Sequence, residues 1–143
     1  MINEIIKEQE LENQFREYLK TRGYQLVERR KPQGIDIEAD NKGIKLVIEV
    51  EGSQKPDGNP LTTQQLYTHF YRAVGQICKR MTDDKSCKYI LLIPYHEKYL
   101  GYVAEMKEAV RRLKLNIIVK KESKYFLINS TQEMLPLDLN ALI

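Results

Sequence analysis

The alternation of apolar and polar side chains is clearest between residues 35 and 50, where it predicts the two strands of a β-hairpin. Apolar side chains occupy every second position of residues 35–39 and of residues 44–50, which is the spacing of one face of a strand. The intervening Asp-Asn-Lys-Gly, residues 40–43, predicts the turn. The side chains on the other face of this hairpin are Asp36, Glu38, Lys45, Val47, Glu49 and Glu51.

Three segments have apolar residues at the three- and four-residue spacing of a helix. They are residues 4–22, 62–81 and 100–114. Gly23 supplies a stop for the first segment, and Thr62 with Gln65 three positions later has the signature of a capping box at the start of the second. The sequence therefore predicts helices at both ends of the hairpin region and one more helix later in the chain.

Four further segments predict strands: residues 24–27, 88–94, 115–121 and 125–128. The segment 88–94, KYILLIP, is almost wholly apolar, which is typical of a strand buried on both faces. The expected order is αβββαβαββ. Three adjacent strands followed by helical crossovers predict a mixed central sheet with helices on both faces, an α/β fold of three αβα layers.

Composition narrows the classes of protein that fit. The chain has 143 residues, with 42% hydrophobic and 30% charged side chains, so a single domain over residues 1–143 is expected and general disorder is excluded. The 23 Lys and Arg against 20 Asp and Glu give a net charge of +3, too small by itself to indicate nucleic acid. No apolar stretch approaches membrane-spanning length, and the start of the chain is charged, so we expect a soluble, cytoplasmic protein.

The residues that could bind a metal ion lie on the polar face of the predicted hairpin. If the turn is centred on Asn41 and Lys42, Asp36 lies diagonally from Glu49, with Cβ atoms about 7 Å apart. Two carboxylates at that spacing can bind one hard cation such as Mg²⁺, which prefers oxygen ligands. The alternative is an ordinary solvated sheet face. Glu38 has Lys45 opposite it as a partner.

Asp36, Glu49 and Glu51 have no evident cationic partner in the sequence pattern, which favours a compensating metal or basic group. A mostly basic stripe at helical spacing begins on the helix at 62–81 and comprises His69, Arg72, Gln76, Lys79 or Arg80, and Asp83. Cations beside carboxylates suit a phosphodiester substrate, and a solvated helix face is the equal alternative.

These residues carry a family resemblance. Gly34-Ile35-Asp36, a turn, Glu49-Val50-Glu51 and a helix with Ala73-Val74-Gly75-Gln76 resemble the PD-(D/E)XK nuclease superfamily. Its αβββαβ core matches the expected order over residues 4–94. The nearest branch is the XisH-type excision-controlling factors, to which the likeness runs to about residue 120. The resemblance implies a restriction endonuclease-like three-layer fold and Mg²⁺- or Mn²⁺-dependent hydrolysis of DNA phosphodiester bonds.

The resemblance also implies roles for individual residues. Asp36 and Glu49 match the metal-binding acids, and Gln76 matches a helix residue that supports the site. Glu51 stands where the superfamily usually has Lys, and as a third acid it could serve as a general base. The expected DNA contacts are Arg72, Lys79, Arg80, Arg30 and Lys31. Glu12 belongs to the first helix, from which an acid sometimes joins the site; a solvated helix residue is the alternative.

Three functions remain open at this point, the third being a purely structural or interaction domain that binds no nucleic acid and shows no salt-dependent DNA binding. The first is a metal-dependent endonuclease, for which a homodimer would bring together the two sites that cleave both strands. The second is a non-cleaving DNA-binding or protein-interaction subunit of the same fold, working with a partner protein in a mobile-element or defence system. The Glu at position 51 favours the second.

Overall fold

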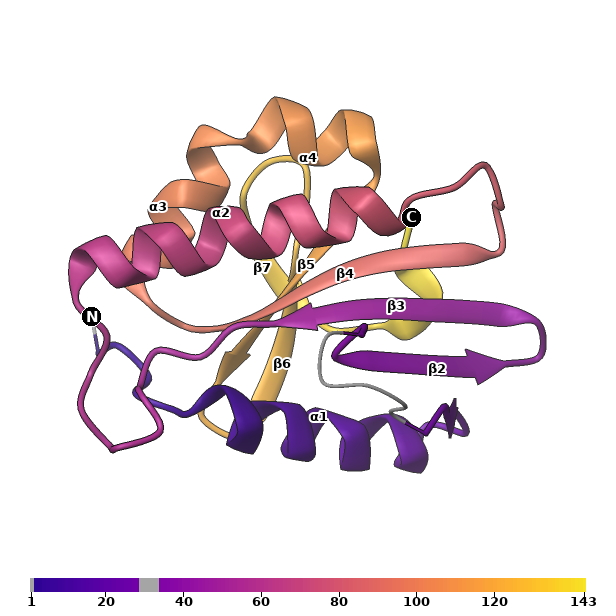
Figure 1. Ribbon diagram of the computed structural model, residues 1–143. Coiled ribbons are helices and arrows are strands. Elements are labelled where there is room, and N and C mark those ends of the chain that lie inside the picture. The colour runs from indigo at the N-terminus through magenta and orange to yellow at the C-terminus, as the bar shows by residue number, and fades with distance from the viewer. Residues whose placement is uncertain (1, 29–33) are drawn as a thin grey trace.

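The computed structural model describes residues 2–28 and 34–143, and within these ranges seven strands form one mixed sheet (Figure 1). The strands lie side by side in sequence order, with β3, β4 and β5 parallel and the outer pairs antiparallel. Their bounds are β1 Gln25–Leu26, β2 Ile37–Asn41, β3 Ile44–Val50, β4 Cys87–Pro94, β5 Leu115–Lys121, β6 Lys124–Ile128 and β7 Met134–Pro136.

Helices cover both faces of this sheet, so the fold has three αβα layers (Figure 1). One face carries α1 (Glu8–Thr21), and the other carries α2 (Thr63–Arg80), α3 (Glu97–Glu105) and α4 (Lys107–Leu113). A short 3₁₀ turn, η1 (Leu139–Ala141), lies close to the C-terminus. None of the helices in the described ranges has the length and apolarity needed to cross a bilayer.

The alternation of β3 divides the core into two halves. Leu46, Ile48 and Val50 pack in the half that includes α1, whereas Val47 packs in the half beneath α2. Burying an aliphatic side chain of this size contributes about 1.5–3 kcal/mol. Side chains two positions apart in a strand lie on the same face of the sheet. Glu49 and Glu51 therefore lie on the α2 side, the side of Val47.

The first helix begins four residues later than predicted, at Glu8 rather than at residue 4. The preceding segment is extended because Ser53 holds it in place. The Ile6 backbone N–H donates to the Ser53 hydroxyl at 3.1 Å, and the Ile6 carbonyl accepts from the Ser53 and Gln54 N–H groups. These contacts join the start of α1 to the chain that leaves β3.

The predicted helix at 100–114 is two helices, α3 and α4, which meet at Met106. The first begins at Glu97 because His96 is its N-cap, with Nδ1 accepting from the Lys98 N–H at 3.1 Å. The chain after β6 contributes two elements for which no prediction was made, β7 and η1. The observed order is therefore αβββαβααβββ in place of αβββαβαββ.

The hairpin register differs from the prediction by two residues. The turn is Lys42-Gly43, with φ values of 52° and 85°, and Asn41 pairs with Ile44. Two positive φ values are what a two-residue type I′ hairpin turn requires. Glu38 consequently lies opposite Val47 rather than Lys45, although Lys45 Nζ still approaches Glu38 Oε1 to 3.9 Å along the diagonal.

Candidate active site

Asp36 and Glu49 form the centre of the candidate site. The ladder between β2 and β3 ends at the Ile37–Ile48 pair, and Asp36 is the residue just before it, so the observed register brings Asp36 towards Glu49. The predicted diagonal placement, which needed Glu38 opposite Lys45, is wrong. Asp36 Oδ2 accepts from the Val50 backbone N–H at 2.8 Å, and the two carboxyl groups share a hydrogen bond. Glu49 is only 8% exposed. Burial, followed by the contact with Asp36, raises the pKa of Glu49 to about 9.

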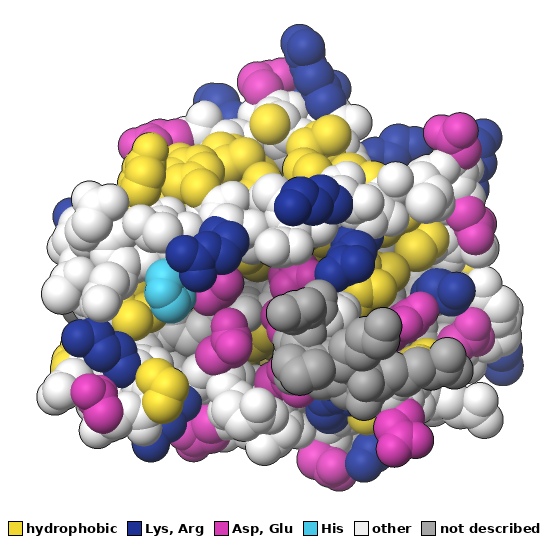
Figure 2. Space-filling model, in the orientation of Figure 1, with side chains coloured by type: hydrophobic (Ala, Val, Ile, Leu, Met, Phe, Trp, Pro, Cys, Tyr) yellow, Lys and Arg dark blue, Asp and Glu magenta, His cyan; other side chains and the backbone are white. Residues whose placement is uncertain are grey.

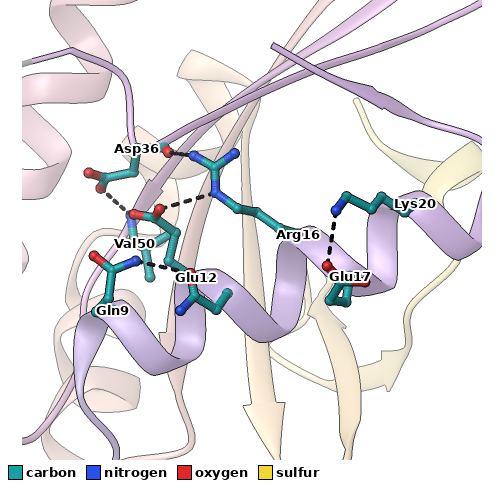
Figure 3. A network of polar contacts seen from close by, with 8 residues as sticks. Gln9, Glu12, Arg16, Glu17, Lys20, Asp36 and Val50 are labelled. Atoms are coloured by element: carbon teal, nitrogen blue, oxygen red, sulfur yellow. Dashed lines mark hydrogen bonds and ion pairs between the residues drawn. The ribbon is translucent and has the colours of Figure 1, made fainter. Parts of the chain in front are cut away.

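A buried ion pair on α1 supports this centre from the other side of the hairpin (Figure 3). Arg16 Nε donates to Glu12 Oε2 at 3.1 Å, and Arg16 Nη2 donates to the Asp36 carbonyl at 2.5 Å. Glu12 is 3% exposed, so the solvated alternative for this residue is wrong. Arg16 thus ties the backbone of Asp36 to the helix and balances the charge of Glu12.

Glu8, which the sequence analysis did not single out, also faces the acidic residues. Glu8 is exposed at the surface, and desolvation beside the sheet, then the charges of Glu51, Asp36 and Glu12, raise its pKa to about 8. Its spacing of four residues from Glu12 places both acids on one side of α1. The four-residue spacing of Glu8 and Glu12 was visible in the sequence. Because the helix was predicted to start at residue 4, Glu8 was not expected to lie in its first turn.

Glu51 lies just after β3, and its side chain is 12% exposed. His69 Nδ1, on α2, lies 3.3 Å from Glu51 Oε2. Burial raises the pKa of Glu51, while His69 lowers it. The hydrogen bond that His69 donates to Glu51 is the largest cause that raises the pKa of His69 above its usual value. The structure therefore supplies a partner for Glu51 that the strand pattern alone did not reveal.

The basic stripe on α2 borders the acidic residues, as Figure 2 shows for the Lys, Arg and His side chains along this helix. Arg80 lowers the pKa of Glu49, and Arg72 lowers that of Glu51, so each guanidinium group lies near one carboxyl group. Lys79 is exposed, and Gln76 is partly buried between Arg72 and Arg80. Among the described residues, Gln76 makes no hydrogen bond to the carboxyl groups.

Five carboxyl groups therefore lie near enough to the end of β3 for their charges to act on one another. They come from α1, from the residue before β2, from β3 and from the residue after β3: Glu8, Glu12, Asp36, Glu49 and Glu51. The predicted DNA contacts Arg30 and Lys31 lie outside the described residues.

The donor chemistry of this centre fits a hard divalent cation. Asp36 and Glu49 already share one hydrogen bond between two acids, and an ion can take the place of that proton. Mg²⁺ is commonly held by one or two carboxylates together with waters and substrate phosphates. Within residues 2–28 and 34–143, no group of three or more His, Cys, Asp or Glu side chains is arranged to hold an ion. The fit is therefore to a two-carboxylate site.

Comparisons of the chain with protein-family models, with curated proteins and with solved structures gave no match. The three-layer α/β fold with a mixed sheet is what the structure shows.

Proposed function

We propose that this protein is a divalent-metal-dependent nuclease of restriction endonuclease-like fold that hydrolyses DNA phosphodiester bonds. The observation that carries the proposal is the pairing of Asp36 with Glu49 on the α2 side of the sheet, beside Glu51. Cationic side chains on α2 border these acids. Carboxylates that hold a cation next to groups that hold phosphate are the requirements of phosphodiester hydrolysis.

Each side chain has a role in this proposal. Asp36 and Glu49 would hold Mg²⁺ or Mn²⁺, which supplies a bound water of lowered pKa and neutralises charge at the phosphate. Glu51 accepts the proton of the attacking water, and its pKa, raised by burial, suits that role. His69 orients Glu51 through the 3.3 Å contact. Arg72 and Lys79 bind phosphates of the DNA backbone.

The Glu at position 51 is the departure from the superfamily pattern, and its surroundings compensate for it. The usual Lys would supply positive charge near the phosphate. Here His69 touches Glu51, and the guanidinium groups of Arg72 and Arg80 act on Glu51 and Glu49. The cationic charge near the proposed centre comes from α2 instead of from the end of β3.

The second candidate is a non-cleaving DNA-binding or protein-interaction subunit of the same fold. The engagement of Glu51 by His69 favours it, because a carboxylate already paired to a cation is a weaker base for water. This candidate keeps the basic border of α2 and predicts DNA binding that weakens with salt but no hydrolysis.

Calorimetric titration of Mn²⁺ into the wild-type protein and the Asp36→Asn variant tests the metal centre. Asn keeps an oxygen that can accept from the Val50 N–H but removes the charge. Glu38→Gln is the matched control, because Glu38 lies on the same face of β2 but pairs with Lys45. We expect micromolar to millimolar binding that Asp36→Asn abolishes and Glu38→Gln preserves. Equal binding by all three proteins would overturn the proposed site.

Cleavage of supercoiled plasmid and of short single- and double-stranded oligonucleotides in Mg²⁺ or Mn²⁺ then separates the two candidates. The nuclease proposal expects products that disappear with Asp36→Asn and Glu49→Gln. Metal binding and salt-sensitive DNA binding without any product would support the non-cleaving subunit.

A further inference from the structure

A pocket of about 240 Å³ lies between α4 and the strands β5 and β6. It includes the start of β5, whereas the acidic residues lie where β3 ends. Because β3, β4 and β5 are parallel, these two positions are at opposite ends of the sheet. Most of the pocket wall is apolar, and it is formed by Val103, Val110, Leu115, Leu127 and Ile128.

Two irregular segments complete the wall, and a side-chain amide holds each of them. Asn116, which is 3% exposed, accepts from the Ile143 N–H at 2.9 Å and donates to the Ile143 carbonyl at 2.8 Å. After β6, Asn129 Oδ1 accepts from the N–H groups of Thr131 at 3.0 Å and of Glu133 at 2.9 Å. The pocket is thus preformed, which reduces the ordering cost of binding a ligand.

The charged side chains that line the pocket are all basic. Lys107 and Arg111 lie one turn apart on α4, and no Asp or Glu of the described ranges is part of the lining. Two acids lie close by in the chain. Glu108 pairs with Arg111 at 2.9 Å, and the Glu133 carboxylate accepts from the Thr131 hydroxyl at 2.7 Å. Lys107 is therefore the cation that we expect to meet a ligand.

The neutral polar groups of the lining add hydrogen-bond donors at the same pocket. Ser130 contributes a hydroxyl and Gln132 an amide, and both can donate to a carboxylate, which only accepts. The volume of about 240 Å³ is below the roughly 300–1,000 Å³ of sites for drug-sized ligands. The lining thus combines a small apolar wall with donors and a cation.

We propose that this pocket binds a short amphiphilic carboxylate, with its hydrocarbon tail against the apolar wall and its carboxylate beside Lys107. The inference goes beyond the proposed nuclease function, because the pocket shares no residue with the acidic centre. Burial of the tail supplies most of the affinity, up to about fourfold for each methylene. Lys107 is exposed, so its charge adds only about two- to fivefold.

An NMR titration of the isotope-labelled protein with hexanoate, butyrate and 1-hexanol tests the pocket. Hexanoate should cause saturable shifts of the Leu127 and Ile128 methyl groups and of the Asn116 side-chain amide. Butyrate, with its shorter tail, should bind about tenfold more weakly. 1-Hexanol has the same tail as hexanoate but no charge, and it should bind about two- to fivefold more weakly.

Lys107→Ala should lower the affinity for hexanoate to that of 1-hexanol and leave 1-hexanol binding unchanged, which also shows that the pocket is intact in the variant. Arg112→Ala is the matched control, because Arg112 lies on α4 but does not line the pocket. It should leave the binding of both ligands unchanged.

Four results would overturn the proposal. They are equal affinity for hexanoate and 1-hexanol, the same shifts with acetate as with hexanoate, the same effect of Lys107→Ala and Arg112→Ala, and no saturable shift at the pocket. Shifts of these resonances with protein concentration in the absence of ligand would assign the pocket to a second copy of the chain and would also overturn the small ligand.

Discussion

His69 Nδ1 lies 3.3 Å from Glu51 Oε2, a contact that joins the first half of α2 to the residue following β3. The pair links the basic helix to the acidic centre. The ionisation of His69 should therefore respond to changes in Glu51 more than to any other single substitution.

Glu51→Gln should lower the pKa of His69. The hydrogen bond that His69 donates to Glu51 is the largest cause that raises this pKa, and the charge of Glu51 acts in the same direction. An NMR titration of the imidazole protons measures the effect. His96, the other of the two histidines in the chain, is an internal control, because burial lowers its pKa and Glu51 is not among the causes. An unchanged titration of His69 in the variant would contradict the pairing.

The stability of the protein without metal should fall as the pH rises from about 5 to 9. The pKa values of Glu8 and Glu49 are raised from 4.5 to about 8 and about 9 in the folded state. Across this window the folded protein keeps protons that the unfolded chain releases. The stabilisation from the protonated groups is complete below the unfolded pKa and is lost as the pH passes the folded values.

Urea unfolding at several pH values measures this dependence. Glu49→Gln should flatten it, because Gln is neutral at every pH, and should stabilise the protein near pH 9 by on the order of 1 kcal/mol. Glu38→Gln, whose carboxylate pairs with Lys45, is the control. Stability that rises over the same window would show that the acidic residues do not retain protons.

Binding of Mn²⁺ at neutral pH should release about one proton per ion, because the carboxyl groups must lose their protons to become ligands. Calorimetric titrations in buffers with different ionisation enthalpies measure the number released. The apparent affinity should also increase with pH until it passes the pKa of about 9 for Glu49. A binding enthalpy that is the same in every buffer would mean that the ion does not displace these protons.

The face of the hairpin that carries the acids was predictable, but the register was not. The two-residue alternation of β3 depends only on local spacing, and the structure confirms it. The register depends on which two residues make the turn. Lys42 adopts a positive φ of 52°, which is uncommon for residues other than Gly, Asn or Asp. The pattern therefore favoured a turn centred one residue earlier.

Contacts between elements that are distant in the sequence could not be predicted from the pattern, for a different reason. Helical periodicity shows which side of α1 or α2 faces the sheet, but not how far each helix is shifted along it. That shift brings His69 to Glu51 and Glu8 to the acidic centre. The capping box at Thr62 and Gln65, by contrast, is a local feature, and the structure confirms both of its hydrogen bonds.

Gly52→Ala should destabilise the protein by about 1–3 kcal/mol. A Cβ at this position would lie 2.7 Å from the Ile6 carbonyl oxygen and 2.9 Å from the Glu8 Cα, both backbone atoms that cannot move aside alone. The start of α1 would have to shift, and Glu8 with it. Chemical unfolding measures the loss of stability.

Gly75→Ala is the matched control for this substitution. Gly75 lies within α2, and nothing lies within 4 Å of the position that its Cβ would take. Ala is favoured over Gly in a helix by about 1 kcal/mol, so this variant should be more stable than the wild type. The same result for both glycines would contradict the close approach of α1 to the chain that leaves β3.

The hydrogen bond from the Val50 N–H to Asp36 Oδ2 has a consequence for local opening of the sheet. Beyond β2, a side-chain carboxylate takes the place that a backbone carbonyl of the neighbouring strand would occupy. The exchange of this amide hydrogen with solvent, and its chemical shift, should therefore change when Asp36 binds an ion or is replaced. A single backbone proton in β3 can thus report occupancy of the acidic centre without any substrate.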